Sequence, residues 1–349
     1  MSPFDDRPAF LPGTDLARLF YTEAVRPLLG DRPHIAARIG PGSDVLGYDT
    51  ARSTDHDWGP RVDLFLTGPG DLSERLSREL PRRFRGWPTH FVPPGARVRS
   101  MADTDGPVDH YVLIRELPGW LESLLGFDPS AAITRRDWLA TPWQRFAEVT
   151  GGAVFHDPDG TLGTIRSRLA WYPEDVWRYV LASQWARIGQ EEAFVGRTAE
   201  AGDDLGSRII TARLCRDVAR LLLLQARRWP PYQKWLGTAI STDPAAALLN
   251  AAMRAGTAGE RESALCAAYE EAGARQNALG LSAPVPATRR PFFDRGYAVI
   301  EAGRFAEALR AGITDPALAG RPLTGSVDQI CDNTDVLERP EECRTLITR

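Results

Sequence analysis

The chain has 349 residues, which is long enough for two domains with separate hydrophobic cores. Its hydrophobic fraction of 43% and charged fraction of 25% are ordinary for a globular protein, and a net charge of −4 disfavours long nucleic acids as ligands. We find no apolar run of membrane-spanning length, no signal-peptide pattern and no metal-ligand spacing among the four cysteines. We therefore expect a cytoplasmic protein with free thiols and no membrane contact.

The first half of the chain is predicted to be a mixed α/β domain, residues 1–170, because apolar strand patterns alternate with amphipathic helix patterns there. Its first helix, residues 13–29, is expected to be capped by Thr14 or Asp15. A second helix is expected to open at residues 43–46. The remaining predicted elements are strands at 34–39, 62–66, 108–114 and 153–156, a helix at 71–80 and a turn at 157–160.

The second half, residues 171–349, is predicted to be a helical domain, because strand signals nearly vanish after residue 173. Gly-, Pro- and Ala-rich stretches at 229–259 and 275–292 are interpreted as loops. The predicted helices are 174–187, 205–228, 260–274 and 297–309.

The segment from Ile39 to Asp57 is the most informative part of the sequence. Gly42-Ser43 follows a short apolar run, and Asp55 and Asp57 come about a dozen residues later. Alternate residues of an extended strand point to one face, so a strand here would aim both carboxylates at one point. Mg²⁺ prefers one or two such oxygens together with substrate phosphates, and a Gly-Ser turn offers N–H groups and a hydroxyl to phosphate. The segment predicts a nucleotide polyphosphate site.

This arrangement resembles the signature of the nucleotidyltransferase superfamily, a Gly-Ser followed about ten residues later by Asp-x-Asp. With its flanking residues it is more similar to the bacterial DUF4037 family, whose activity is not known. That likeness continues through further short motifs, namely Val195-Gly-Arg197, Asp204-Leu-Gly-Ser207, Tyr232-Gln-Lys-Trp235, Pro291-Phe-Phe-Asp294 and Asp328-Gln-x-x-Asp-x-Thr-Asp335. The resemblance implies an α/β plus α fold: an N-terminal nucleotidyltransferase-like domain and a C-terminal helical bundle that binds the acceptor.

Superfamily members usually add a third acidic residue from a later strand. We predict Asp109 for this metal ligand, because Val108-Asp109-His110-Tyr-Val-Leu places one carboxylate in an apolar strand. A lone buried carboxylate is costly unless it is paired or bound to a metal. Asp63, in the strand that follows the Asp-x-Asp motif, is the alternative.

Several other residues are candidates for contacts with the substrates. Arg52 and Arg61 flank the carboxylates and could bind phosphate as planar forks, or lie solvated or ion-paired at the surface. Lys234 is the only lysine in the chain; it could reach the phosphates or rest its stem on the neighbouring aromatic rings. Glu192, beside Glu191, is the candidate general base if burial raises its pKa, although an exposed acidic helix end explains it as well.

We therefore expect a Mg²⁺-dependent nucleotidyltransferase that moves a nucleoside monophosphate, AMP from ATP in the first instance, to a hydroxyl group of a small molecule. In this hypothesis Asp55, Asp57 and Asp109 hold the metal, and Gly42 and Ser43 bind the triphosphate. Two alternatives stay open: an enzyme that nucleotidylates proteins, and a non-catalytic nucleotide-binding protein or a fold adapted to another reaction. The sequence does not identify the acceptor molecule or the base of the nucleotide.

Overall fold

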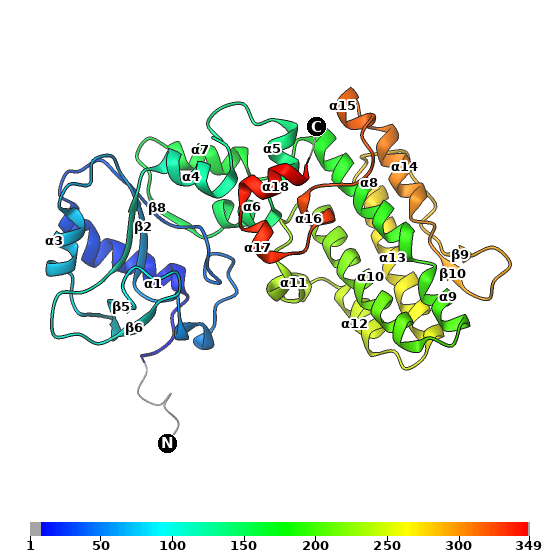
Figure 1. Ribbon diagram of the computed structural model, residues 1–349, viewed down its shortest axis with the longest axis horizontal. Coiled ribbons are helices and arrows are strands. Elements are labelled where there is room, and N and C mark those ends of the chain that lie inside the picture. Colours follow the sequence, from blue (N-terminus) through cyan, green and yellow to red (C-terminus); the bar gives the residue numbers. More distant parts are fainter. Residues whose placement is uncertain (1–7, 348–349) are drawn as a thin grey trace, which may run out of the picture. The chain divides into compact units, whose positions relative to one another are not determined.

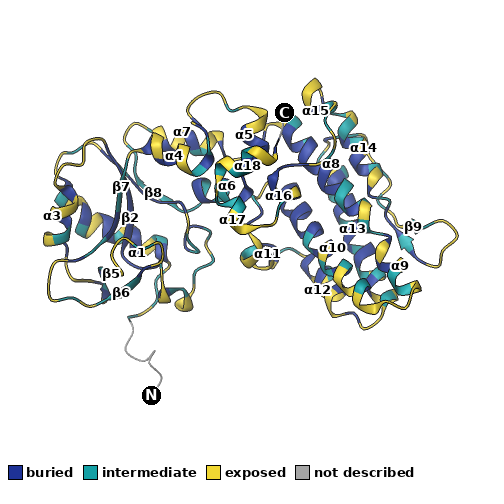
Figure 2. Ribbon diagram, in the orientation of Figure 1, coloured by how far each residue is buried: buried dark blue, intermediate teal, exposed yellow. Residues whose placement is uncertain are grey.

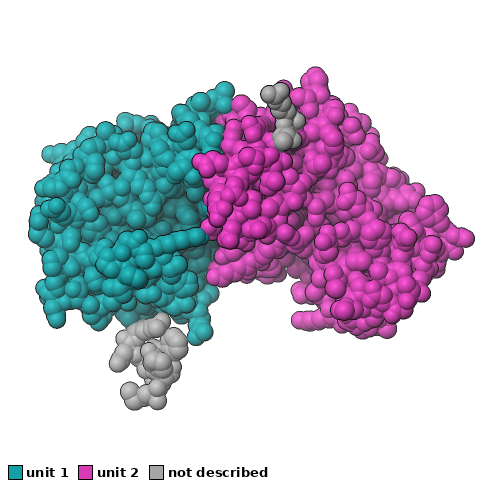
Figure 3. Space-filling model, viewed as in Figure 1, with its two compact units in different colours: residues 1–132, 145–170 teal, residues 133–144, 171–349 magenta. Residues whose placement is uncertain are grey.

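The computed structural model describes residues 8–347. The chain divides into two compact units, coloured separately in Figure 3. The units are Met1–Ala132 with Arg145–Ala170, and Ile133–Gln144 with Trp171–Arg349. The predicted division near residue 170 coincides with one of these boundaries, whereas residues 133–144 belong to the second unit. Each unit is described by itself below.

The first unit is built on a four-stranded mixed sheet, in which Figure 1 labels β2 and β8. Its strand order is β7-β2-β1-β8. Strand β1 runs antiparallel to both β2 and β8, and β2 runs parallel to β7. The predicted alternation in β2 is replaced by burial of every residue, because both faces of this central strand are covered (Figure 2). The strands are β1 (Ile35–Arg38), β2 (Arg61–Phe65), β7 (Tyr111–Arg115) and β8 (Ala153–His156).

One face of the sheet packs on the helical run formed by α1 (Gly13–Phe20), the π-helical η1 (Tyr21–Val25) and α2 (Arg26–Leu29). This run has the predicted bounds, but its N-cap residue is Pro12 and the Gly13 N–H donates to Asp49 Oδ2 at 2.6 Å, so the predicted caps are wrong. The core on this face joins residues of the helices with Val62, Leu64 and Val112 of the sheet. The remaining elements of this unit are η2 (Ala51–Asp55), α3 (Leu72–Glu79), β3 (Arg83–Phe84), β4 (Trp87–Pro88), β5 (His90–Val92), β6 (Ser100–Ala102), α4 (Leu117–Leu125), α6 (Trp143–Thr150) and α7 (Thr161–Arg168).

The second unit is helical, as the sequence predicts. Its long helix α8 packs against α10 and α14, and α10 also packs against α9, α12 and α13. Large aromatic side chains fill the core; Trp185 of α8 stacks on Phe305 of α14 with ring centroids 4.4 Å apart. The main helices are α5 (Arg135–Ala140), α8 (Glu174–Glu191), α9 (Phe194–Glu200), α10 (Asp204–Gln225), α13 (Ala258–Ala278) and α14 (Gly303–Ala311). The shorter elements are α11 (Gln233–Ile240), α12 (Ala246–Arg254), β9 (Arg290–Pro291), β10 (Ala298–Val299), α15 (Pro316–Ala319), α16 (Val327–Ile330), α17 (Thr334–Leu337) and α18 (Pro340–Leu346).

Two of the predictions for this unit are wrong. The stretch 229–259, predicted as a loop, contains α11 and α12, since its alanines favour helix and its few apolar residues pack against α10. The helix predicted at 297–309 begins only at Gly303, because β10 pairs with β9 before it. Within the described residues, no helix is long and apolar enough to cross a membrane.

Candidate functional site

The Gly42-Ser43 turn is wrapped around a fully buried arginine, Arg38, the last residue of β1. Its guanidinium donates to both carboxylate oxygens of Asp44, with Nε–Oδ2 and Nη2–Oδ1 distances of 2.7 Å, and Nη2 also donates to the Pro41 carbonyl. Gly42 has a φ of +156°, and a Cβ there would collide with Arg38 Nη2. Residues 43–47 form turns, so the helix predicted to open at Ser43 is absent. The ion pair holds the loop in this compact form.

Asp55 and Asp57 do not lie on a strand, which corrects the prediction of alternating carboxylates. A Thr50–Ser53 capping box instead starts the 3₁₀ helix η2, which ends at Asp55, and Asp57 has a left-handed φ of +49°. Asp55 is exposed, and its Oδ1 lies 3.0 Å from both the backbone nitrogen and Nδ1 of His56. Trp58, which directly follows, belongs to the core and donates to Asp49.

The Asp57 carboxylate is held by two residues from distant parts of the chain. Its Oδ1 accepts from the Arg99 backbone N–H at 3.1 Å and from the Tyr111 hydroxyl at 3.1 Å. Tyr111, the second of these partners, lies at the start of β7. Burial is the largest cause of the raised pKa of its phenol, so the hydroxyl keeps its proton at neutral pH and acts as a donor.

Asp109 lies in the loop before β7, because that strand begins at Tyr111 and not at the predicted Val108. Its Oδ1 pairs with Arg99 Nη2 at 2.8 Å, and its Oδ2 is buried without a hydrogen-bond partner among the described residues. The predicted environment was therefore wrong in detail, yet Asp109 is a partly buried carboxylate with one oxygen unused.

Strand register places three of the predicted elements at one edge of the sheet. Ala37 of β1 pairs with Asp63 of the antiparallel β2, and Arg61 of β2 pairs with Tyr111 of the parallel β7. The end of β1 thus lies beside the starts of β2 and β7. The Gly42-Ser43 turn follows the end of β1, whereas Asp57 and Asp109 precede the starts of β2 and β7.

Arginines dominate the sheet face that carries Arg61, Asp63 and Phe65. Asp63 is 1% exposed and lies 3.6 Å from nitrogens of both Arg38 and Arg115. It also accepts from the Ile39 backbone N–H. Asp63 thus neutralises the buried Arg38 and the partly exposed Arg115, and Asp109 stays the candidate for the third carboxylate.

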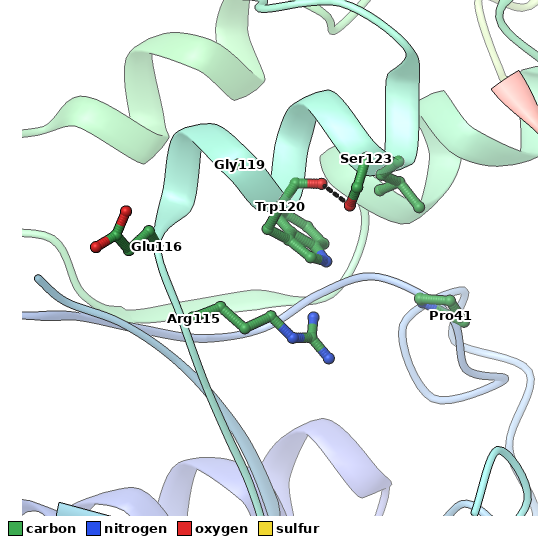
Figure 4. A pocket seen from close by; sticks show the side chains of 7 residues that line it. Pro41, Arg115, Glu116, Gly119, Trp120 and Ser123 are labelled. Carbon is green, nitrogen blue, oxygen red and sulfur yellow. Dashed lines mark hydrogen bonds between the residues drawn. The ribbon is translucent and has the colours of Figure 1, made fainter. Parts of the chain in front are cut away.

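A shallow hollow of about 520 Å³ adjoins the Gly42-Ser43 turn on this unit. Figure 4 shows Arg115 and Pro41 on one side of it and Trp120 of α4 on the other. The Trp120 ring packs on Phe65 with centroids 5.1 Å apart. The hollow is lined by Pro41, Arg115, Glu116, Gly119, Trp120, Ser123 and Leu124, so it is flanked by the turn and does not include the predicted carboxylates.

The described residues contain no group of three or more Asp, Glu, His or Cys side chains arranged to hold a metal ion. Mg²⁺ commonly takes only one or two protein carboxylates and completes its shell with water and phosphate. Asp57 and Asp109, which share the partner Arg99, fit that smaller donor set, and the unused Oδ2 of Asp109 is an available ligand atom. Asp55 differs from them in being exposed, and its Oδ1 is engaged by the neighbouring His56.

The other predicted contacts lie elsewhere. Arg52 is an exposed residue of η2. Lys234 is an exposed residue of α11 in the second unit, and its ammonium lies 4.8 Å from the Trp235 ring centroid, a cation–π contact.

Glu192 follows α8 in the second unit and is largely buried. Its two carboxylate oxygens each accept a 2.8 Å hydrogen bond, from the backbone N–H groups of Ile300 and Ala302. Burial raises its pKa to about 7, which meets the condition set for a general base. Its contacts nevertheless give it a structural task, which is to anchor the segment that leads into α14.

The C-terminal motif that begins at Asp328 also has a structural task. Asp328 Oδ2 accepts from the Trp143 backbone N–H at 2.9 Å, and Gln329 Nε2 donates to Gln184 Oε1 at 2.9 Å. Asp332 pairs with Arg216 of α10 at 3.0 Å. Trp143, at the start of α6, belongs to the second unit, so these contacts attach α16 to residues of its own unit.

Comparison with protein-family models gives one match. Residues 138–236 match the family described as "Domain of unknown function (DUF4037)". The expected likeness to this family is confirmed over those residues, most of which lie in the helical unit. No curated protein and no solved structure matches the chain. The match leaves out Gly42, Ser43, Asp57 and Asp109, and it carries no activity.

Sequence reasoning missed the residues that organise this edge, namely Arg38, Arg99 and Tyr111. Arg38 had a local signal, since an arginine at the end of an apolar strand needs a carboxylate, and Asp44 is six residues away. Arg99 had none, because its contacts with Asp57 span 42 residues.

Proposed function

We propose that this protein is a Mg²⁺-dependent nucleotidyltransferase that transfers a nucleoside monophosphate, with AMP from ATP as the first candidate, to the hydroxyl group of a small molecule. The observation that supports it most is the strand register: the end of β1, which the Gly42-Ser43 turn follows, lies beside the starts of β2 and β7, which Asp57 and Asp109 precede. A glycine turn suited to phosphate next to carboxylates suited to Mg²⁺ is the minimum that in-line phosphoryl chemistry requires.

In this proposal Asp57 and Asp109 would hold the metal, with Asp55 as the other candidate ligand. Bound Mg²⁺ would supply neutralisation of the charge on the phosphates. The protein's own contribution is positioning: Tyr111 and the Arg99 backbone fix the Asp57 carboxylate, and the Arg38–Asp44 pair fixes the turn that carries Gly42 and Ser43.

The choice of a small acceptor rests on charge. The chain carries a net charge of −4, whereas proteins that hold long nucleic acids usually present strongly basic surfaces. An exposed hydroxyl on a second protein is the competing acceptor, and incubating the enzyme and labelled nucleotide with cell lysate separates the two. Label in small soluble products supports the proposal, and label in protein bands supports the alternative.

A non-catalytic nucleotide-binding protein is the second candidate. It is favoured by one observation, the engagement of Asp109 Oδ1 by Arg99 and of Asp55 by His56, which leaves few carboxylate atoms for metal. Binding of a nucleoside triphosphate without any release of pyrophosphate would favour this candidate.

The test is a thermal-shift screen of the four nucleoside triphosphates, each with and without Mg²⁺, on the wild type and on Asp57→Asn. A ligand that binds the folded state raises its apparent stability by mass action. We expect one triphosphate to raise the Tm in a Mg²⁺-dependent manner and the variant to lose that shift. An unchanged shift in Asp57→Asn would contradict the proposed metal site.

A further inference from the structure

Arg61, the first residue of β2, is a buried guanidinium with few contacts. The residue is 7% exposed, and its guanidinium carbon lies 4.4 Å from the centroid of the Tyr111 ring. Its hydrogen bond within the described residues is a long one, from Nη1 to the Asp57 carbonyl at 3.3 Å, and its Nε is buried without a partner there. Most of the N–H donors of this side chain are therefore unused.

Three other arginines that approach this sheet have carboxylate partners. Arg38 pairs with Asp44 and Asp63, Arg115 pairs with Asp63, and Arg99 pairs with Asp109. Among the described residues, no carboxylate forms an ion pair with Arg61. The nearby Arg38 opposes the charge of Arg61, and Asp63 and Asp44 compensate it only in part, since neither forms an ion pair with it.

A buried charge without a direct ion-pair partner is unfavourable, and a ligand of opposite charge would offset that cost. Arg61 stands at the edge of the sheet where Asp57 precedes β2 and the Gly42-Ser43 turn follows β1. A guanidinium fork matches two oxygens of a phosphate group, and stacking on Tyr111 orients that fork before any ligand arrives.

We infer that Arg61 is an oxyanion-binding residue, which takes a phosphate group of the substrate. That the oxyanion is a phosphate rests on the proposed function, whereas the need for an anion rests on the contacts of Arg61 alone. The competing explanation is structural: the guanidinium would only brace the Asp57 carbonyl and the Tyr111 ring.

The two explanations predict opposite effects of Arg61→Met on the unliganded protein. If the Arg61 charge serves to bind a ligand, its removal should leave the urea midpoint of unfolding unchanged or raise it. If the charge is a structural brace, its removal should lower the midpoint, as we expect for Arg38→Met, which would break a paired and buried arginine. A variant that fails to fold would therefore count against the inference.

The binding probe is inorganic tripolyphosphate, titrated calorimetrically with and without Mg²⁺. We expect the wild type to bind it in at least one of these conditions and Arg61→Met to weaken binding at least tenfold, which is about 1.4 kcal/mol. Arg61→Lys keeps the charge but not the fork and should lie between the two. Arg75→Met removes a partly exposed arginine of α3 that pairs with Glu79 in the same unit, and it should bind as the wild type does.

Two results would overturn the inference: tripolyphosphate that does not bind the wild type in either condition, or Arg61→Met that binds it equally well. The proposed function fails separately. If Arg61→Met loses tripolyphosphate but no nucleoside triphosphate yields pyrophosphate, the oxyanion site stands and nucleotidyl transfer does not. If transfer occurs and Arg61→Met binds tripolyphosphate normally, nucleotidyl transfer stands and the oxyanion role of Arg61 does not.

Discussion

Asp57 and Arg99 are joined by a reciprocal pair of hydrogen bonds: the Asp57 backbone N–H donates to the Arg99 carbonyl at 2.7 Å, and the Arg99 N–H donates to Asp57 Oδ1 at 3.1 Å. The same Arg99 binds Asp109 through its side chain at 2.8 Å. One residue therefore fixes both carboxylates that we assign to the metal. Its backbone contacts also hold Asp57 in a left-handed conformation that such residues adopt only with local support.

Asp57→Asn is expected to abolish nucleotidyl transfer while the protein stays folded. Asparagine tolerates a left-handed backbone, and its amide oxygen can accept from the same two donors, so the local structure should survive. The charge that attracts the metal is lost, and we expect the rate of pyrophosphate release to fall by roughly a thousandfold. Initial rates, with a urea titration to verify folding, measure both effects.

Asp55→Asn is the matched control for that variant, because Asp55 is two residues away, exposed and paired with His56. We expect its loss of rate to be smaller than that of Asp57→Asn. Unchanged turnover in Asp57→Asn would rule out the proposed mechanism.

Arg99→Met is expected to destabilise the first unit by on the order of 3 kcal/mol, since it leaves Asp109 without its charge partner and removes donors to the carbonyls of Phe91 and Asp109. The free energy of unfolding in urea measures the loss. Arg97→Met, an exposed arginine two residues earlier, should change it by less than about 0.5 kcal/mol. Equal effects of the two variants would show that Arg99 does not organise this edge.

Gly42→Ala tests whether the turn depends on the Arg38–Asp44 pair. The added methyl would collide with Arg38 Nη2 and Asp44 Oδ1, and the +156° φ adds backbone strain. Separating this buried pair should cost on the order of 3 kcal/mol in the free energy of unfolding.

Gly47→Ala is the control for that change. Gly47 lies in the same loop with a φ of +72°, but nothing lies within 4 Å of an added Cβ. Gly47→Ala should therefore lower the free energy of unfolding only by the cost of a left-handed backbone at alanine, about 1 to 2 kcal/mol. If both variants lose the same amount, steric separation of the ion pair is not the cause.

The spacing of apolar residues predicted the main strands and helices, because that spacing follows from the geometry of each element alone. Strands β1 and β8 and helices α1 and α8 follow apolar patterns that survive in the structure. The strand expected at Asp55–Asp57 failed because a Thr50–Ser53 capping box, a local signal, outweighed the alternation of two carboxylates. The partners of Asp57 could not be predicted, since Arg99 and Tyr111 are 42 and 54 residues away and only tertiary packing brings them close.

Glu192 gives the second unit a defined pH dependence. Burial is the largest cause that raises its pKa from 4.5 to about 7, so between these values the folded protein holds a proton that the unfolded chain has released. The free energy of unfolding must therefore fall as the pH rises from about 4.5 to about 7, by up to roughly 3 kcal/mol, and level off above. Urea titrations at pH 4.5 to 8 measure the slope.

Glu192→Gln should remove the part of this slope that Glu192 causes. Glu191→Gln, whose carboxylate pairs with Arg213 at 2.6 Å, should retain it. Because a glutamine can accept from only one of the Ile300 and Ala302 N–H groups without opposing the other, Glu192→Gln should also be less stable at every pH. The slope is thus the decisive quantity, and an unchanged slope in Glu192→Gln would place the titrating group elsewhere, with Asp328, whose pKa burial raises to about 6, as the next candidate.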